Sequence, residues 1–305
     1  MRHFLSLSDL GAEGIVQQLD RADFFKKTRG TSSGSRPLSG TSVALIFEKA
    51  STRTRVSLEV AVAELGGHPL VITSATSQMG RGEPLSDTAK VMSRMVHAMT
   101  VRTFGHDRIE ELARHSTIPV LNALTDLSHP MQLLADLQTV RQVRGKLQGL
   151  KYAWIGDGNN MANSWIEAAG LLQLHLVLAC PEGFEPNAEF LQRAKSQGAD
   201  VQLVRDPVAA AAQADVISTD VFTSMGQEAD QARRLQAFQG MCVTQQLVER
   251  ANRNVVVLHC LPAHRGEEIE AQVIDGPNSH VWDQSEARLH TSKAILCWAL
   301  ERDAG

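Results

Sequence analysis

The chain has no long apolar run and no long run of basic residues among its 305 residues. No apolar stretch reaches the roughly 20 residues that a membrane-spanning helix needs, so a membrane partner is not expected. The formal net charge of -4 comes without clustered Lys and Arg. Nucleic-acid binders need such clusters for phosphate contacts, so a nucleic-acid partner is not expected either. A small anionic substrate needs only one local basic pocket and remains compatible with this composition.

The sequence is also poor in cysteine, and its four cysteines are scattered: Cys180, Cys242, Cys260 and Cys297. None forms a C-x-x-C pair, so neither a disulfide framework nor a zinc site is expected, and the four are interpreted as reduced thiols. The N-terminal segment is not typical of a signal peptide, because Asp9 interrupts its short apolar part. Together these features predict a cytoplasmic protein.

Short apolar runs alternate with segments of helical periodicity, and the length suits two domains of about 150 residues each. Strands that alternate with helices predict parallel sheets covered on both faces. The candidate strands form a first series, Val43–Phe47, Pro69–Thr73, Thr100–Phe104 and Pro119–Ala123, and a second series, Tyr152–Ile155, Leu174–Ala179, Val201–Val204, Val216–Ser218 and Val255–Leu258. We therefore expect an α/β protein with two doubly wound parallel-sheet domains joined by interdomain helices.

Three further segments complete this expectation. Pro130–Val143, between the two strand series, has a helical pattern, and so does Ser285–Leu300 near the C-terminus. The pair Gly66-Gly67 is typical of a helix C-terminus, whereas the Ser- and Gly-rich stretch Gly30–Gly40 predicts a surface loop.

In open parallel sheets, ligands bind beyond the carboxyl ends of the strands. The segment FEKASTRTRVSLE lies at such a place, because Ser51 to Arg55 follow a candidate strand and open a candidate helix. Unpaired N–H groups, hydroxyls and an arginine fork at a helix N-terminus suit a phosphate. The alternative is that Ser51 or Thr52 only caps the helix. No G-x-x-x-x-G-K-[ST] P-loop occurs in the chain.

Two more polar groups follow strands of the first series. Arg102 follows the apolar residues Met99 and Val101 within a candidate strand, where a buried charge is costly unless it is paired. It is therefore either part of a structural ion pair or an anion ligand. His129 and Gln132 follow the next strand at a helix start, and a carbonyl-polarising His129 is one hypothesis beside simple packing.

In the second series, GDGNNMANS follows a strand and opens a helix, which raises a dinucleotide-binding fingerprint as a rival. The match fails at its third glycine, which is Met161 here. Asn159 and Asn160 instead place amides where a polar ligand could be read. An NAD-dependent dehydrogenase remains a second functional hypothesis.

Two later segments also follow strands. Asp220 precedes a small, Gly-containing loop, which is typical of ammonium recognition under a closing loop or, alternatively, of an ordinary surface loop. Cys260 lies in HCLPAHRGEE, where several titratable neighbours indicate a functional site, although a cysteine after a strand is most often a small core residue.

Taken together, seven segments resemble ornithine carbamoyltransferases, of the aspartate/ornithine carbamoyltransferase superfamily. They are FEKASTRTRVSLE, SQMGRGEPLSDTAKVMSR, HPMQLLADL, GDGNNMANSW, SMGQE, HCLPAHRGEE and SEARLH. STRTR and HPxQ belong to carbamoyltransferases in general, whereas the pairing of DxxxSMG with HCLPAHRGEE points to ornithine. The resemblance covers almost the whole chain and implies that STRTR cradles carbamoyl phosphate.

The resemblance implies a carbamoyl-phosphate-binding domain over residues 1–133, an ornithine-binding domain over 134–284 and a C-terminal helix, 285–305, that returns to the first domain. It implies transfer of the carbamoyl group from carbamoyl phosphate to the δ-amine of L-ornithine, giving L-citrulline and phosphate in arginine or urea-type metabolism. No cofactor or metal is implied. The implied assembly is a homotrimer, or a multiple of trimers, with shared active sites.

Residue roles also follow from the resemblance. The implied carbamoyl phosphate ligands are Ser51, Thr52, Arg53, Thr54, Gln78 (which would reach a neighbouring subunit's site), Arg102, His129, Gln132, Cys260, Leu261 and Arg288. The implied ornithine ligands are Asn160, Asp220, Ser224 and Met225. The catalytic residues would be Arg102, His129 and Cys260. Arg102 and His129 would stabilise the oxyanion with the hydroxyl of Thr54, and either Cys260 or the departing phosphate would assist with the amine proton.

The sequence departs from the family's pattern at two places. Ala50 replaces the proline usual before STRTR, and Phe222 stands where a Trp is common. Neither changes a ligand group, so both are interpreted as tuning. Two alternatives within the superfamily stay open: a carbamoyltransferase for another amine, such as putrescine or an N-acylated ornithine, and a catalytically silent relative.

Overall fold

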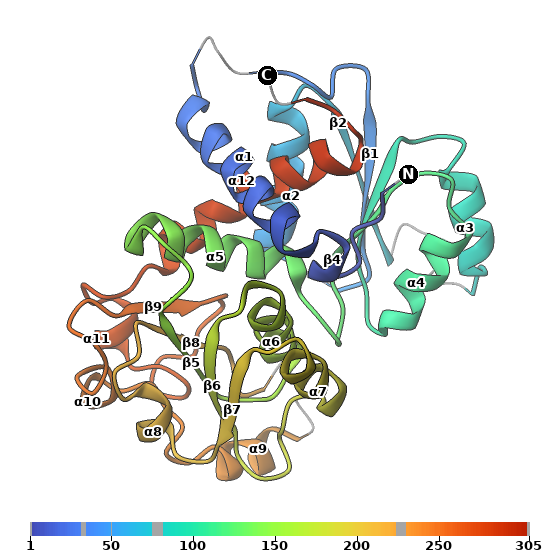
Figure 1. Cartoon of the computed structure of the whole chain (residues 1–305). Coiled ribbons are helices and arrows are strands. Elements are labelled where there is room, and N and C mark those ends of the chain that lie inside the picture. The colour runs from blue at the N-terminus through green and yellow to red at the C-terminus, as the bar shows by residue number, and fades with distance from the viewer. Residues whose placement is uncertain (1, 32–34, 50, 75–81, 224–229, 304–305) are drawn as a thin grey trace. The chain divides into compact units, whose positions relative to one another are not determined.

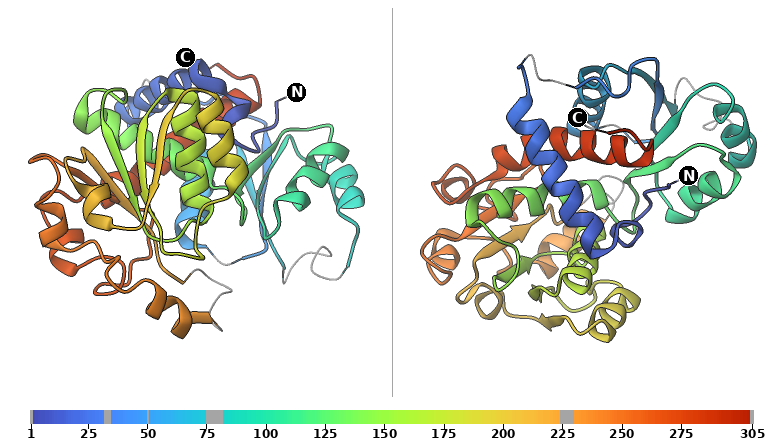
Figure 2. Two further views of the ribbon diagram at one scale, coloured as in Figure 1. Left: turned by 60° about the horizontal axis from the view of Figure 1, so that its bottom comes forward. Right: turned by 45° about the horizontal axis from the view of Figure 1, so that its top comes forward.

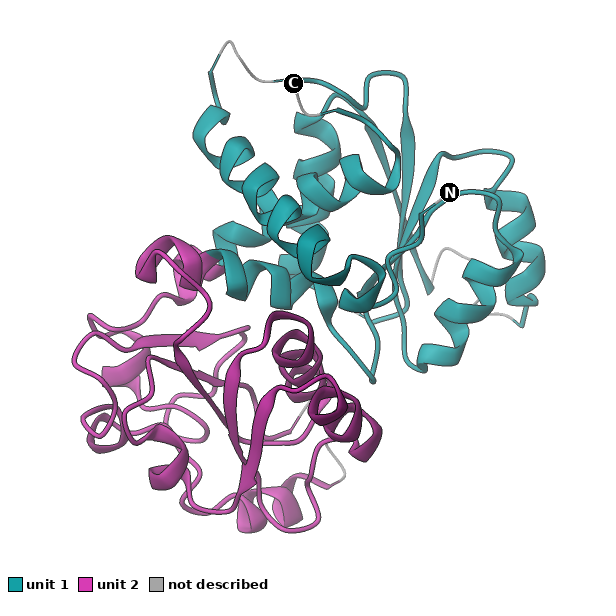
Figure 3. Ribbon diagram, in the orientation of Figure 1, with its two compact units in different colours: residues 1–138, 285–305 teal, residues 139–284 magenta. Residues whose placement is uncertain are grey.

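The computed structural model describes residues 2–31, 35–49, 51–74, 82–223 and 230–303 (Figure 1). The chain divides into two compact units, of which unit 1 comprises residues 1–138 and 285–305 and unit 2 comprises 139–284 (Figure 3). Helices α5 (Pro130–Arg144) and α12 (Val281–Ala299) each begin in one unit and end in the other. Among the described residues, no helix is long and apolar enough to cross a membrane.

Unit 1 contains a parallel sheet, called sheet A, with the strand order β2-β1-β3-β4. Its strands are β1 (Ser42–Phe47), β2 (His68–Thr73), β3 (Ala98–Arg102) and β4 (Val120–Leu124). Its other elements are η1 (Leu7–Asp9), α1 (Gly11–Thr28), α2 (Thr52–Glu64), α3 (Leu85–Met92) and α4 (His106–His115). Helices α3 and α4 lie on one side of sheet A, and α1, α2 and α12 lie on the other (Figures 1 and 2).

Unit 2 contains a second parallel sheet, called sheet B, with the order β7-β6-β5-β8-β9. Its strands are β5 (Lys151–Ile155), β6 (His175–Ala179), β7 (Asp200–Val204), β8 (Val216–Thr219) and β9 (Val256–His259). Its helices are α6 (Asn160–Leu172), α7 (Ala188–Ser196), α8 (Pro207–Ala211), α9 (Gln231–Ala237), α10 (Gln245–Val248) and α11 (Ala271–Ile274). Helices α6 and α7 cover one face, and α8, α10 and α11 lie on the other side (Figure 1).

The core of unit 2 shows why its strands are continuous apolar runs. Both faces of sheet B are covered by helices, so successive side chains of β5 are buried in both directions. The large aromatic side chains there also satisfy their polar ends. Trp154 Nε1 donates to the Asp157 carbonyl at 2.9 Å, and Trp165 Nε1 donates to Ser218 Oγ at 3.2 Å. These bonds allow bulky aromatics to fill the core without a buried, unsatisfied donor.

The predicted fold class is confirmed, because two parallel α/β sheets are present and each of the nine candidate strands overlaps an observed strand. The predicted helix Pro130–Val143 is α5, and α2 ends at Glu64, just before Gly66, which adopts a positive φ of 87°. Helix α12 begins four residues earlier than the predicted Ser285. Residues 32–34 of the predicted surface loop lie outside the described residues.

Candidate active site

Each sheet has a switch point, where the chain leaves neighbouring strands toward opposite faces. In sheet A the neighbours are β1, which leads into α2, and β3, which leads into α4 on the other side (Figure 2). In sheet B the neighbouring strands β5 and β8 are separated in sequence by the β6–β7 excursion. The carboxyl ends of strands at such points are where α/β proteins bind ligands. Several predicted site residues lie at the carboxyl ends of these strands: Ser51–Thr54 after β1, Arg102 at the end of β3, Asn160 after β5 and Asp220 after β8. The others follow neighbouring strands, His129 and Gln132 after β4 and Cys260 and Leu261 after β9.

In unit 1, two arginines converge on the hydroxyl of Thr54, in the first turn of α2. Arg102 Nη1 lies 3.4 Å from Thr54 Oγ1, and Arg288 Nη2 on α12 donates to the same oxygen at 3.0 Å. All three side chains are buried. Arg102 pairs in register with Phe47 on β1, and the β3–β4 register shifts at this residue. Such an irregularity re-aims a side chain, and here it accompanies an arginine at the switch point.

The start of α5 adds two residues to this cluster: His129, which directly precedes the helix, and Gln132, in its first turn. Arg288 Nη1 donates to Gln132 Oε1 at 2.7 Å and lies 3.4 Å from His129 Nε2. Because an arginine can only donate, His129 Nε2 is the acceptor and we assign the ring proton to Nδ1. Burial lowers the pKa of His129 well below its usual value, and the charges of Arg288 and Arg102 lower it further. The cluster therefore combines two fixed cations with a neutral imidazole, which suits an acyl phosphate.

The STRT segment forms the start of α2, as a phosphate site requires. Ser51 is the N-cap residue, but its side chain makes no capping hydrogen bond. The interpretation that Ser51 serves as a side-chain cap is therefore wrong. Thr52 and Arg53 occupy the first helical positions, where backbone N–H groups have no intrahelical partner. A cavity of about 550 Å³ opens beside Thr52 and is lined by Lys49 and Arg55 and also by Glu48, whose charge is paired with Arg108. These features favour an anion at the helix N-terminus.

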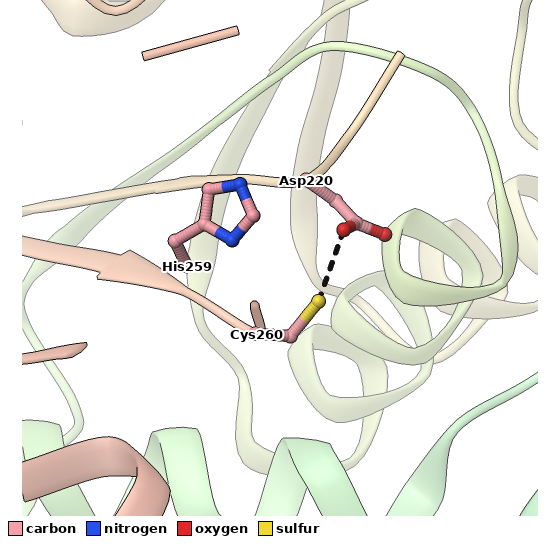
Figure 4. Close-up of side chains that lie close together, drawn as sticks. All are labelled: Asp220, His259 and Cys260. Carbon is pink, nitrogen blue, oxygen red and sulfur yellow. Dashed lines mark hydrogen bonds between the residues drawn. The ribbon is translucent and has the colours of Figure 1, made fainter. Parts of the chain in front are cut away.

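In unit 2, Asp220 lies directly after β8 and gathers three hydrogen-bond donors. Cys260 Sγ donates to Asp220 Oδ1 at 3.0 Å (Figure 4). Asn159 Nδ2 donates to Asp220 Oδ2 at 3.0 Å, and the Val221 N–H donates to Oδ1 at 2.8 Å. Two separately predicted site residues, Asp220 and Cys260, are thus brought together at one sheet edge. A carboxylate in this position can attract a substrate ammonium group.

Asn159 does not act as the expected ligand-reading amide. Its side-chain oxygen accepts from the N–H groups of Met161 and Ala162, which caps α6, while its nitrogen bonds Asp220. Asn160 is the first residue of α6, and its carbonyl accepts from Ser164 Oγ at 2.8 Å. Of the two amides predicted to contact a polar ligand, only that of Asn160 keeps this predicted role.

The same cap argues against the dinucleotide hypothesis. In that hypothesis the pyrophosphate would bind the N–H groups at the start of α6, which Asn159 already occupies. A Cβ on Gly158 would meet the backbone of Pro186 at 2.1 Å, so Gly158 serves close packing within the protein. Met161, at the third glycine position, is buried. The GDGNN turn is therefore built for internal contacts and not for a dinucleotide.

One cluster of possible metal ligands comprises Asp220, His259 and Cys260, whose potential ligand atoms lie within 4.8 Å of one another (Figure 4). A second such group among the described residues is His264, Glu267 and Glu268. His259, however, uses both ring nitrogens internally: Nε2 lies 3.0 Å from Glu268 Oε1, and Nδ1 accepts from the Leu261 N–H at 2.8 Å. Its geometry therefore serves the fold of the loop.

One buried ion pair beside this site was missed by the sequence analysis. Arg234 on α9 donates two hydrogen bonds to Asp157 Oδ2, at 3.1 and 2.7 Å, and also lies over the ring of Phe184. Burial raises the pKa of Asp157 to about 6, an effect that Arg234 opposes and the nearby Asp220 reinforces. The Asp of GDGNN was visible in the sequence, but nothing local identified its partner 77 residues away.

The amino-acid sequence matches two family descriptions in succession. Residues 2–142 match "Aspartate/ornithine carbamoyltransferase, carbamoyl-P binding domain", and residues 148–299 match "Aspartate/ornithine carbamoyltransferase, Asp/Orn binding domain". The chain belongs to the aspartate/ornithine carbamoyltransferase family. Its relatives within that family include an ornithine carbamoyltransferase of Geobacter sulfurreducens, 53% identical over 97% of this chain and 98% of the relative. Another, from Halorhodospira halophila, is 52% identical over the same shares.

Solved structures of carbamoyltransferases agree with this membership. The ornithine carbamoyltransferase of Pyrococcus furiosus matches with a TM-score of 0.93 and 45% sequence identity, covering 98% of this chain and 97% of that one. The anabolic ornithine carbamoyltransferase of Campylobacter jejuni matches with a TM-score of 0.92 and 37% identity, over 99% of both chains.

Some carbamoyltransferase positions predicted from the sequence are not described. Gln78, Ser224 and Met225 lie outside the described residues, as does Ala50, so their roles stay predictions. Phe222 is described: its ring is buried and stacks on Phe238 with centroids 4.6 Å apart. That packing agrees with a role in tuning the loop and not in binding a ligand.

Proposed function

We propose that this chain transfers the carbamoyl group of carbamoyl phosphate to the δ-amine of L-ornithine, giving L-citrulline and phosphate. The observation that carries the proposal is the convergence of Arg102 and Arg288 on Thr54, beside a neutral His129, at the switch point of sheet A. The names of the relatives supply the acceptor, because they are ornithine carbamoyltransferases. The first domain would bind carbamoyl phosphate and the second would bind ornithine, with the C-terminal helix returning to the first.

Carbamoyl phosphate has two ends, and the described residues offer groups suited to each. The phosphate fits the N-terminus of α2, with the hydroxyls of Ser51, Thr52 and Thr54 and the guanidinium of Arg53. Arg102 and His129 would hold the carbonyl oxygen, where negative charge develops. Remaining contacts would come from the proposed ligands Gln132, Cys260, Leu261, Arg288 and a neighbouring subunit's Gln78.

Ornithine would bind through its α-amino and carboxylate groups. The Asp220 carboxylate suits the ammonium, and Asn160, Ser224 and Met225 would complete the site. The δ-amine must then be neutral, because only its lone pair can attack the carbonyl carbon; a free alkylamine is mostly protonated at pH 7.

The proposed reaction forms a C–N bond and breaks the C–O bond to phosphate. The δ-nitrogen attacks, the carbonyl π electrons move to oxygen, and a tetrahedral intermediate forms. Arg102 and Thr54 stabilise this oxyanion as preorganised donors. The electrons return, phosphate departs and the nitrogen loses one proton. Holding an anion and an amine together supplies much of the acceleration.

Either Cys260 or the departing phosphate could accept the proton that the attacking amine loses, and we propose the phosphate. The Cys260 thiol donates its hydrogen to Asp220 Oδ1, and a protonated thiol cannot take up another proton in this role. A phosphate leaving group carries oxygens that become more basic as the bond breaks. Cys260 would then position the amine and the Asp220 carboxylate.

A citrulline assay tests the function directly. Ornithine is varied at saturating carbamoyl phosphate, with putrescine and N-acetylornithine as competing acceptors. We expect saturable citrulline production and little transfer to the other amines. Preference for putrescine or N-acetylornithine would identify the chain as a carbamoyltransferase for that amine. If none of the three amines is carbamoylated, the chain is a catalytically silent relative.

We also propose a homotrimer, or a multiple of trimers, in the cytoplasm. Strand β2 is an edge of sheet A, and Leu70 on it and Val56 on α2 are 41% and 54% exposed. Exposed apolar side chains beside an open strand edge are typical of an interface. Val56→Asp should lower the mass seen by sedimentation, whereas Val208→Asp, at a comparably exposed valine of unit 2, should not. The four free cysteines fit a reducing compartment.

A further inference from the structure

We propose that His259 and Glu268 are positioning residues for the transfer reaction: they hold the Cys260–Leu261 segment in the shape that presents Cys260 to Asp220. The inference rests on the proposed function, which assigns Cys260, Leu261 and Asp220 to the substrates. His259 and Glu268 themselves would touch neither substrate.

His259 ends β9 and contacts the following loop through its ring. The side chain is completely buried, with 0% exposure. Its Nδ1 accepts from the Leu261 N–H at 2.8 Å, and its Nε2 lies 3.0 Å from Glu268 Oε1. Since Nδ1 accepts a hydrogen bond, the ring proton must be on Nε2, which then donates to the carboxylate. Glu268 thereby fixes the tautomer that the Leu261 bond requires.

Glu268 connects the two ends of the loop. Its side chain is also completely buried, and its Oε1 accepts a second hydrogen bond from the His264 N–H at 2.6 Å. One carboxylate oxygen therefore bonds the residue that enters the loop and a residue four positions before itself. A buried carboxylate is costly to desolvate, and these bonds offset part of that cost.

The loop needs such support because of the backbone at Leu261. Its φ is 59°, in the left-handed region that branched residues rarely adopt. Local strain of this kind persists only where surrounding contacts determine it. The bond from the Leu261 N–H to His259 is such a contact. Without it we expect the backbone to relax and Cys260, the residue between them, to lose its 3.0 Å contact with Asp220 (Figure 4).

Four variants separate the two hydrogen bonds of the His259 ring, one with Glu268 and one with the Leu261 N–H. Glu268→Ala removes the acceptor, whereas Glu268→Gln keeps a carbonyl oxygen in its place. His259→Gln keeps a donor toward Glu268 but loses the acceptor for the Leu261 N–H. His259→Asn keeps that acceptor, because its Oδ1 takes the place of Nδ1. Glu267→Ala is the matched control, since it removes the neighbouring, partly exposed carboxylate.

Steady-state kinetics with ornithine, and calorimetry with inorganic phosphate, are the first measurements. For Glu268→Ala and His259→Gln we expect kcat to fall on the order of 100-fold, because a shift of about 1 Å in a reacting site has that effect. Phosphate should bind as in the wild type, since residues of unit 1 hold it. Glu268→Gln and His259→Asn should retain more activity than their partners, and Glu267→Ala should match the wild type.

Thiol alkylation gives a readout that does not require turnover. The rate of Cys260 modification by iodoacetamide is followed by peptide mass spectrometry. Cys297 of unit 1 is the folding control: its thiol is buried and its pKa is raised to about 12 by that burial, so it should stay unmodified in every variant that remains folded. We expect the Cys260 rate to change at least severalfold in Glu268→Ala and to stay unchanged in Glu267→Ala.

The outcomes are distinct. Wild-type kcat, ornithine KM and Cys260 alkylation in Glu268→Ala and His259→Gln would overturn the positioning role. Equal losses in Glu268→Ala and Glu268→Gln, together with weakened phosphate binding and a lowered Tm, would overturn it in favour of a general structural role. If the wild type makes no citrulline, the proposed function fails, while the alkylation rates still decide whether the pair holds Cys260.

Discussion

Replacing Arg102 with Met should separate activity from stability. Arg102 and Arg288 both reach Thr54 Oγ1, at 3.4 and 3.0 Å, so their donor nitrogens can be no more than about 6.4 Å apart, the sum of the two distances. Two unit charges at that separation repel by about 3 kcal/mol at an effective dielectric constant near 20. A bound phosphate would attract both cations, so their close approach suits an anionic ligand.

We therefore expect Arg102→Met to reduce citrulline formation by about 10²- to 10³-fold, the usual effect of losing one donor to an oxyanion. The free energy of unfolding without ligand should stay equal or rise, by an amount on the order of 3 kcal/mol. The increase in Tm that the wild type shows with saturating phosphate should shrink in the variant, because ligand stabilisation follows affinity. Citrulline colorimetry and thermal unfolding with and without phosphate measure these effects.

Arg108→Met is the matched control. Arg108 on α4 forms an ion pair with the largely buried Glu48, Nη2 to Oε1 at 2.6 Å, so its loss leaves a carboxylate without its charge partner. We expect this variant to lower the free energy of unfolding by about 1–3 kcal/mol. If Arg102→Met instead destabilised the unliganded protein as much as Arg108→Met while keeping its activity, Arg102 would be a structural ion-pair residue and the reasoning would be refuted.

Three other predictions concern single side chains. The folded-state pKa of His129 lies below its unfolded value near 6.5. The unfolded chain therefore binds more protons, and the free energy of unfolding falls as pH drops below 6.5. In denaturation series at pH 7 and pH 5, His129→Gln should lose less stability than the wild type. The pKa of Asp157 is raised from 3.8 to about 6, so the stability that its protonated form contributes is lost as pH rises through 6. Relative to Asp157→Asn, the wild type should lose about 1–2 kcal/mol of unfolding free energy between pH 5 and 7.5. If the difference in unfolding free energy between the two proteins is the same at both pH values, Asp157 does not titrate there. Asp220→Asn should raise the KM for ornithine at least tenfold, about 1.4 kcal/mol, while phosphate affinity measured by calorimetry stays the same; an unchanged ornithine KM would remove Asp220 from the site.

The amino-acid sequence by itself determined the elements and the places where chemistry was to be sought. Apolar runs with β-branched residues, separated by helical periodicity, predicted the nine strands. Most of these strands are buried on both faces and read as continuous apolar runs, whereas β2 and β7 are partly exposed. The order of strand, polar turn and helix also placed Ser51–Thr54 and Asp220 beyond the carboxyl ends of strands, and Arg102 is the last residue of β3. These are properties of local sequence, so local patterns predicted them.

Only the tertiary structure decided which of those residues meet. Arg288 bonds Thr54 across 234 positions of sequence, and it does so because α12 packs within unit 1. The sequence predicted that the amide of Asn159 contacts a ligand, but in the structure its oxygen caps α6 and its nitrogen donates to Asp220. The sequence indicated a functional site in HCLPAHRGEE, but nothing local showed that His259 and Glu268, at its two ends, bond each other. Hydrogen-bond partners are chosen by sheet order and packing, which depend on contacts across the whole unit and not on the periodicity of any one segment.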